Sequence, residues 1–120
     1  MTDLKTPAIV VNFKAYREVD GEGSLKLAKI CESVSKDSGV TIAVCPPMVE
    51  LGTIARAVDI PVFSQNADPH APGSSTGWVT ASMIKSTGAI GTLINHSEHR
   101  FENNVISESV ELAKADDLQN

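Results

Sequence analysis

The sequence lacks several features that would place a protein in a specialised class. Its 120 residues include only two cysteines, three Phe, one Trp and one Tyr. No apolar run approaches the roughly 20 residues that a membrane-spanning helix needs. The basic residues form no cluster and the net charge is −5, a balance that disfavours nucleic acid as the main partner. Neither a membrane span nor a nucleic-acid interface is therefore expected.

The two cysteines give no indication of a chemical role, but they bear on the cellular location of the protein. Cys31 and Cys45 both lie in apolar surroundings, which favours buried, reduced thiols over a disulfide. Neither their spacing nor their neighbours resembles a zinc site. The N-terminal residues MTDLKTP lack the layout of a signal peptide, so a cytoplasmic location is expected. Length and average composition predict one ordinary domain over residues 1–120.

Strands and helices are expected to alternate along the whole chain. Apolar, β-branched stretches predict buried strands over residues 7–13, 40–45, 60–65 and 89–95. Apolar residues at helical spacing predict helices over residues 23–38, 49–58, 81–87 and 103–114. Strict alternation indicates a parallel sheet with right-handed crossovers, in either an open α/β sandwich or part of a (β/α) barrel. No GxGxxG or P-loop motif supports a nucleotide-binding fold.

The segment from residue 66 to residue 79 predicts a loop beyond the usual length, which favours a binding role. Trp78 in this loop is expected to pack against something, since an exposed Trp is unfavourable. Thr80 is expected to cap the helix that follows. Gly39 and Gly88 are expected to end helices.

Polar residues follow three of the four expected strands. In parallel α/β proteins the carboxyl ends of the strands form the ligand-binding edge. The residues placed at this edge are Asn12, Lys14, Gln65, Asn66, Asn95, His96 and Glu98.

Each of the chemically active residues at this edge has more than one interpretation. Lys14 can bind an anion and stabilise developing negative charge, or it can be a solvated surface lysine. His96 can act as an acid, base or electrophile, particularly if a helix starts at Ser97, or it can simply bond a carbonyl. A metal site formed by His96, Glu98 and His99 is a further reading. Glu98 either pairs with Lys14 or is exposed.

Four motifs carry a resemblance to a known family. They are NFK at 12–14, SQN at 64–66, STG at 75–77 and GTLINHSEHR at 91–100. In order and spacing they resemble triosephosphate isomerase, most closely its compact archaeal form. The resemblance implies a (β/α)4 unit, the N-terminal half of a TIM barrel that has about 250 residues when complete. It also implies an isomerase of glycolysis and gluconeogenesis that interconverts dihydroxyacetone phosphate and glyceraldehyde 3-phosphate without a cofactor.

The resemblance assigns a role to each matching residue. Asn12 supports the substrate site, and Lys14 binds the phosphate-bearing substrate and offsets the enediolate charge. His96 is the neutral imidazole that polarises the carbonyl and moves protons between the two oxygens. This family is itself a standard example of a neutral histidine acting beside a glutamate base. Glu98 orders Lys14 and Asn12. Thr76 reaches into a neighbouring subunit. Trp78 differs from the family's loop and has no role assigned by the resemblance; it is expected at the interface between chains because an exposed Trp is unfavourable.

The resemblance leaves part of the family's machinery unmatched. Its catalytic glutamate follows strand six, and its lid and phosphate-binding glycines follow strands six to eight; no segment of the 120 residues matches them. Because a half-barrel leaves two strand edges open, self-association is expected, most simply as a two-fold dimer that restores eight strands. The alternatives are pairing with a complementary C-terminal half-barrel, a catalytically silent structural half-barrel, or a small-anion binder.

Overall fold

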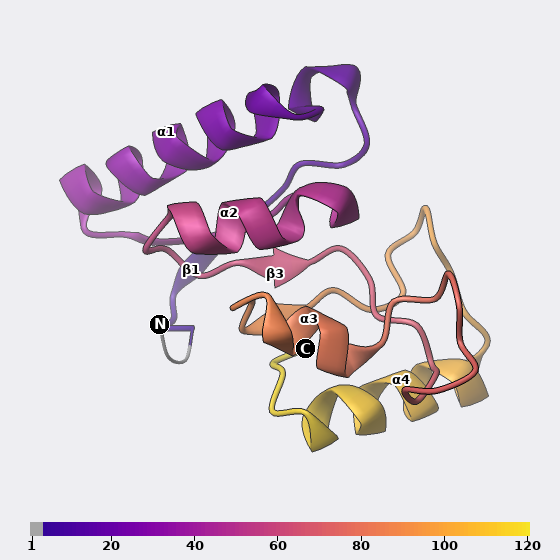
Figure 1. Cartoon of the computed structure of the whole chain (residues 1–120). Helices are drawn as coiled ribbons and strands as arrows, with labels where there is room; N and C mark the ends of the chain where they lie inside the picture. The colour runs from indigo at the N-terminus through magenta and orange to yellow at the C-terminus, as the bar shows by residue number, and fades with distance from the viewer. Residues whose placement is uncertain (1–3) are drawn as a thin grey trace.

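The structure, a computed structural model, describes residues 4–120. Strands and helices alternate as the sequence predicts (Figure 1). Two short 3-10 turns, η1 (Arg17–Val19) and η2 (Met48–Glu50), precede the first two helices and were not expected. The main elements are β1 (Ala8–Asn12), α1 (Glu22–Ser38), β2 (Thr41–Cys45), α2 (Leu51–Ala57), β3 (Phe63–Ser64), α3 (Ala81–Ser86), β4 (Gly91–Thr92) and α4 (Asn103–Ala115).

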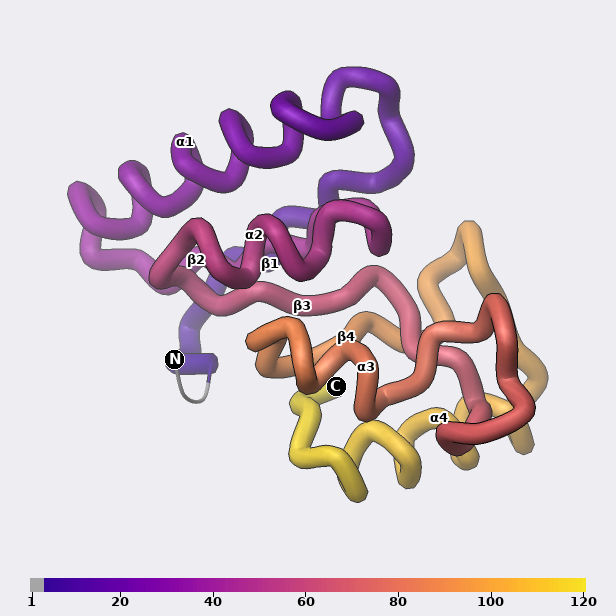
Figure 2. The backbone as a smooth tube through the Cα atoms, viewed as in Figure 1, coloured from indigo at the N-terminus to yellow at the C-terminus, as the bar shows by residue number. Residues whose placement is uncertain are grey.

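The strands are parallel and follow one another in chain order. β1 pairs with β2 over five residues, and β3 pairs with β4. A single bridge between Val44 and Val62 joins the two pairs. The order is therefore β1–β2–β3–β4, that of a sheet wound in one direction, and the successive units follow each other across the molecule (Figure 2).

Two predicted strands are wrong in length. The sequence indicated strands over residues 60–65 and 89–95, but β3 and β4 each contain two residues. Pro61 explains part of the difference: its carbonyl accepts a bond from the Val44 amide at 3.0 Å, but it has no N–H with which to extend the ladder. At the other end, Asn95 has a φ of 65° and leaves the extended conformation.

A short C-terminal segment forms the beginning of a fifth strand, which the sequence did not predict. Gln119 makes a parallel bridge with Gly91. The Thr92 amide donates to the Gln119 carbonyl at 2.8 Å, and the Gln119 amide donates to the Ile90 carbonyl at 2.9 Å. Leu118 is buried beside them. The free edge of β4 is therefore occupied by residues 118–120.

The core lies mainly between the strands and the helices. Ile54 of α2, Ile84 of α3 and Val44 of β2 are fully buried there. A smaller cluster contains Ala43, Cys45, Phe63 and Ile90, with Leu4 and Leu93 packed against it. The helix-covered face is thus the thicker hydrophobic layer, as in one half of a barrel.

Several local predictions are confirmed. Cys31 and Cys45 are buried free thiols, and burial raises the pKa of Cys45 to about 12. The Thr80 hydroxyl accepts a bond from the Met83 amide and caps α3. Gly39 and Gly88 have φ values of 75° and 99° where α1 and α3 end, a backbone conformation that glycine adopts without strain. None of the helices within residues 4–120 has the length and apolarity to cross a bilayer.

Glu32 joins α1 to the end of α2. Its buried carboxylate accepts a bond from the Asp59 amide at 2.6 Å and lies 3.5 Å from the Lys29 ammonium. The bond from the Asp59 amide is the main cause that lowers the pKa of Glu32. A carboxyl whose pKa is lowered by folding stabilises the folded state above its unfolded pKa, and this contribution is lost as the pH falls through the folded pKa.

Replacing Glu32 with Gln should therefore flatten the acid side of the stability curve. At neutral pH we expect the free energy of unfolding to fall by about 1 kcal/mol, the difference between a hydrogen bond to a charged acceptor and one to a neutral acceptor, because the Gln oxygen can still accept from the Asp59 amide. The variant and the parent should begin to converge as the pH falls below about 4.3, the ordinary pKa of Glu, and should meet once the pH is below the lower pKa that Glu32 has in the folded state. Urea unfolding across this pH range measures both, with Glu108→Gln on the exposed side of α4 as the matched control. If the free energy of unfolding had the same pH dependence in the parent and in Glu32→Gln, the role assigned to the Glu32 carboxylate would be contradicted.

Candidate active site

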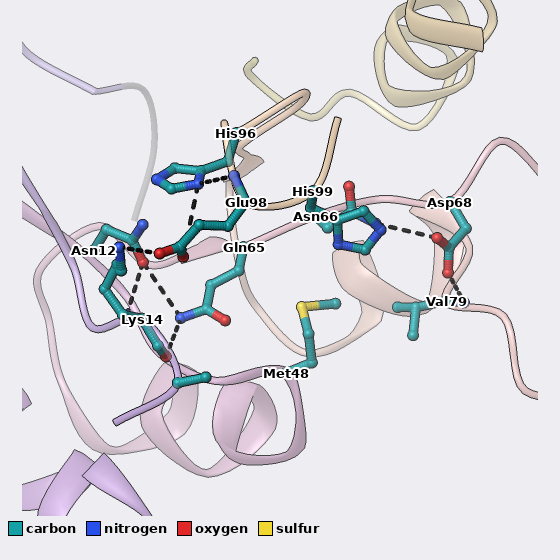
Figure 3. Close-up of a pocket in the computed structure, with 11 residues that line it drawn as sticks. Asn12, Lys14, Met48, Gln65, Asn66, Asp68, Val79, His96, Glu98 and His99 are labelled. Carbon is teal, nitrogen blue, oxygen red and sulfur yellow. Dashed lines mark hydrogen bonds and ion pairs between the residues drawn. The ribbon is translucent and has the colours of Figure 1, made fainter. Parts of the chain in front are cut away.

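Residues from all four β/α units line one cavity of about 400 Å³. The cavity lies at the carboxyl ends of the strands, where the sequence placed it. Figure 3 shows Asn12, Lys14, Gln65, His96 and Glu98 at one end and Asn66, Asp68, Val79 and His99 at the other, with Met48 between them. Four of the residues predicted for the site, Asn12, Lys14, His96 and Glu98, are therefore brought together.

The backbone at Lys14 is held in an uncommon conformation. Lys14 has a φ of 63°, a region that residues with a side chain rarely adopt. The Asn12 side-chain oxygen accepts a bond from the Lys14 amide at 2.9 Å. The Gln65 side-chain amide donates to the Lys14 carbonyl at 2.9 Å and to the Cys45 carbonyl at 3.0 Å. These bonds turn the chain after β1 and direct Lys14 along the edge of the sheet.

Lys14 and Glu98 form an ion pair across the edge (Figure 3). Glu98 therefore pairs with Lys14, as one of its two interpretations predicted, and its side chain is also 59% exposed, as the other predicted. The hydrogen bond with Glu98 is the main cause that raises the pKa of Lys14, and the same bond lowers the pKa of Glu98. Both side chains are thus charged at neutral pH. The Lys14 side chain is 29% exposed, so a solute in the cavity can reach it.

The geometry around His96 indicates which ring nitrogen carries the proton. The Glu98 amide donates to His96 Nδ1 at 3.1 Å. A nitrogen that accepts a bond holds a lone pair, so in this geometry Nδ1 is the acceptor and Nε2 is the nitrogen that carries the ring proton. The Glu98 carboxylate is also near Nδ1 but lies farther away, at 3.9 Å. His96 is thus prepared to donate a hydrogen bond from Nε2.

The segment that carries His96 is a turn, not a helix. The sequence reading allowed a short helix from Ser97 whose dipole would keep the ring neutral, and this is wrong. The His99 amide donates to the His96 carbonyl at 2.7 Å, and the residues after His96 form a turn before α4 begins at Asn103. The tautomer is set by one backbone amide rather than by a helix terminus.

The far end of the cavity is formed by the neck of the long loop. The Asp68 carboxylate accepts bonds from the Val79 amide at 2.7 Å and from the Asn66 side chain at 3.1 Å. The Asp68 amide donates in turn to the Val79 carbonyl at 2.9 Å. Sequence reasoning gave no role to Asp68; its place just after a strand was the only available signal. Asp68 closes the loop at its base.

The two residues predicted for an interface lie outside the cavity. Thr76 is exposed near the tip of the loop. Trp78 is half exposed and stacks on His70, with ring centroids 4.4 Å apart. The expected packing of Trp78 is therefore found within the loop itself, though only over part of the ring. Within residues 4–120 no three His, Cys, Asp or Glu side chains are placed to hold a metal ion.

Parallel strands that alternate with helices, with a cavity lined by polar side chains at their carboxyl edge, define the chain as one part of a (β/α)-barrel protein. Residues 7–120 match the family described as triosephosphate isomerase. The chain belongs to the triosephosphate isomerase family.

Similar proteins of known name belong to the same family. The chain is 45% identical over 116 residues to the triosephosphate isomerase of Caldivirga maquilingensis, a match that covers 97% of this chain and 52% of the relative. It is 44% identical to that of Methanococcoides burtonii and 46% identical to that of Methanosarcina barkeri, covering 51% and 49% of their lengths. The chain spans about half the length of the relatives it matches, which is consistent with a half-barrel.

Proposed function

We propose that residues 1–120 supply the lysine and histidine half of a triosephosphate isomerase active site. Turnover then requires a further polypeptide segment that supplies the glutamate base and the phosphate-binding loops. The observation that carries this proposal is the placement of Lys14 and His96 in one cavity, with His96 Nδ1 bonded to the Glu98 amide. We also propose that residues 1–120 form a single domain and that the protein is located in the cytoplasm, as the sequence predicts.

The chemistry of these groups suits an aldose–ketose isomerisation. A triose phosphate is an anion, and among the described residues that line the cavity Lys14 is the one lysine or arginine. His96 Nε2–H would donate to the substrate carbonyl and stabilise the negative charge that develops on its oxygen when a proton leaves the adjacent carbon. Glu98 and Asn12 act through Lys14, which they hold in place.

Neither carboxylate in the cavity lining is suited to act as the base. Glu98 is paired with Lys14, and that bond lowers the pKa of Glu98, so the carboxylate is a weaker base. Asp68 accepts two bonds that close the long loop. Absence of a positioned general base typically lowers a rate by ~10²–10⁴. The chain by itself should therefore have little or no turnover.

The first test compares the chain alone with the chain completed. Residues 1–120 are fused to the unmatched half of the Caldivirga maquilingensis relative and purified from a host that lacks its own isomerase. We expect conversion of glyceraldehyde 3-phosphate by the fusion protein and none by the chain alone or by the second half alone. Turnover by the chain alone, increasing faster than linearly with concentration, would show that self-assembly makes a complete site.

A catalytically silent, self-associating half-barrel is the second candidate. Within residues 4–120, β1 pairs with a strand on one side only, which favours self-association. In either case Thr76 and Trp78 are assigned to contact with another subunit. A fusion protein that folds but has no isomerase activity would support this second function. Titration with phosphate would then measure whether Lys14 binds an anion.

A further inference from the structure

The short stretch between β3 and the long loop is held by side chains rather than by the sheet. The Leu93 amide donates to the Ser64 carbonyl at 2.9 Å. Within residues 4–120, the next backbone-to-backbone hydrogen bond along the chain is made by Asp68, whose amide donates to the Val79 carbonyl. Residues 65–67 therefore lie outside the ladder of β3, and their position depends on side-chain contacts.

Each residue of this stretch has its own anchor. Gln65 and Asn66 both line the cavity, and Ala67 is buried in the core. The Gln65 side-chain amide donates to the Lys14 carbonyl, and the side-chain amide of the buried Asn66 donates to Asp68 at 3.1 Å (Figure 3). One end of the stretch thus holds the backbone of Lys14, and the other end is held by Asp68.

The second oxygen of the Asp68 carboxylate is anchored as well. It accepts a bond from the Val79 amide at 2.7 Å, across eleven positions of the sequence. Together with the bond from the Asp68 amide to the Val79 carbonyl, this bond joins the two ends of the long loop. Val79 is followed by Thr80, which is buried and caps α3. Asp68 therefore connects residues 65–67 to the start of a helix.

The two donors explain why an acidic residue suits this position. A backbone N–H and a side-chain N–H both point at Asp68, and an ionised carboxylate has an acceptor for each. Such charge-assisted bonds are roughly twice as strong as bonds between neutral groups. An asparagine could make the same two contacts, because the Asn66 amide can turn its oxygen toward the new donor. A leucine of similar volume could make neither.

We propose that Asp68 is a positioning residue of the active site, which acts through Asn66 and Gln65 to hold Lys14 in place. Asp68 lies outside the four motifs that carry the family resemblance. Lys14 has a φ of 63°, a conformation that persists only where neighbouring groups hold it. The inference rests on the proposed function of Lys14 and adds a residue to that site.

Steady-state kinetics of the fusion protein test this role. Asp68→Leu is expected to lower kcat/KM about tenfold, since a hydrogen bond to a charged group contributes enough for a factor of this size. Asp68→Asn, which keeps both contacts, should stay within about threefold of the parent. In a Lys14→Met background, Asp68→Leu should lower kcat/KM by less than about twofold, because the group it positions is already absent. A change that only reduced the fraction of folded protein would cause the same loss in both backgrounds.

Amide hydrogen exchange measures the same coupling without turnover, in the 120-residue chain and in the fusion protein. In Asp68→Leu the Val79 amide should exchange at least about fivefold faster, because it has lost its acceptor. The Lys14 amide, which donates to the Asn12 side chain, should exchange faster as well. In Asp68→Asn both rates should stay near those of the parent. Asp37→Leu is the matched control and should change neither rate, because Asp37 is an exposed residue of α1 that does not line the cavity.

Exchanging the two side chains tests the link from its other end. Asn66→Asp alone places one carboxylate against another with no donor between them. It should therefore speed exchange of the Lys14 amide, as Asp68→Leu does. In the double variant Asn66→Asp with Asp68→Asn, the side chain at position 68 accepts from the Val79 amide and donates to position 66. Exchange should then return to near the parent rate. This pair decides the matter if circular dichroism shows that Asp68→Leu does not fold.

The outcomes separate the role of Asp68 from the proposed function. An inactive parent fusion protein would contradict the proposed function, and exchange of the Lys14 amide would still decide whether Asp68 holds Lys14. Faster exchange at Val79 alone would mean that Asp68 only closes the loop, and would overturn the proposal. Equal losses of kcat/KM in Asp68→Asn and Asp68→Leu would overturn it as well, because the charge itself would then be required. So would a loss from Asp68→Leu that is the same with and without Lys14.

Discussion

Replacing Lys14 with Met is expected to lower the kcat/KM of the fusion protein by at least about a hundredfold, the usual effect of removing a group that stabilises transition-state charge. Lys14 is the one lysine or arginine among the described residues that line the cavity with His96, and its hydrogen bond with Glu98 keeps it charged. Methionine has a similar length and no charge, so it removes the electrostatic contribution and preserves most of the packing. A steady-state coupled assay from glyceraldehyde 3-phosphate measures the effect.

Lys36→Met is the matched control for this substitution. Lys36 is an exposed lysine of α1 on a different side of the molecule from the cavity. Lys36→Met should leave the kcat/KM of the fusion protein within about twofold of the parent value, since substitutions of exposed residues away from a site have small effects. Equal losses for Lys14→Met and Lys36→Met would indicate a general effect of net charge. Full activity of Lys14→Met would contradict the role assigned to this lysine.

Replacing Gly91 with Ala is expected to destabilise the fold by about 2–3 kcal/mol, the upper range for overfilling a packed site. A β-carbon at this position would lie 2.4 Å from a ring carbon of Phe63 and 2.7 Å from the Gln119 carbonyl oxygen. Neither neighbour can give way freely, because Phe63 belongs to the buried cluster and Gln119 is bonded to β4. Urea unfolding measures the loss.

The same substitution should also release residues 118–120 locally. The Gln119 amide, which donates to the Ile90 carbonyl, should exchange its hydrogen faster in Gly91→Ala than in the parent. Gly52→Ala is the control, because its β-carbon would meet only the flexible side chain of Arg56, at 3.1 Å. That variant should be neutral or stabilised by up to about 1 kcal/mol, since alanine favours helix. Unchanged stability and unchanged exchange in Gly91→Ala would show that the close approach is absent.

The candidate site was predictable in its main residues and not in its supporting ones. Asn12, Lys14, His96 and Glu98 follow strands, and the carboxyl ends of parallel strands share one edge, so their proximity follows from the element order. Gln65 was placed at the edge, but its bonds to the carbonyls of Lys14 and Cys45 join residues 51 and 20 positions apart. A backbone carbonyl has no signature in the sequence, and such a partner appears only when the chain is folded.

In the fold as well, the elements that depend on a local sequence pattern were predicted closely, and those that depend on distant contacts were not. β1 and α1 were predicted closely, because a buried strand and an amphipathic helix each carry a periodic pattern of side chains. β3 and β4 were predicted too long, since a ladder needs a partner as well as a pattern. The short helix that the sequence allowed at Ser97 is a turn, in which the His99 amide donates to the His96 carbonyl across three residues.

The sequence by itself determined the alternation of parallel strands and helices, the edge at which the active groups gather, and the family to which the chain belongs. Side-chain periodicity and four motifs carry that information, and both are local. Only the tertiary structure decided that Gln119 occupies the edge of β4 and that, within residues 4–120, β1 pairs with β2 alone. Strand pairing is made by backbone N–H and C=O groups, which every residue except proline has, so the side-chain sequence alone does not specify which edge will be covered.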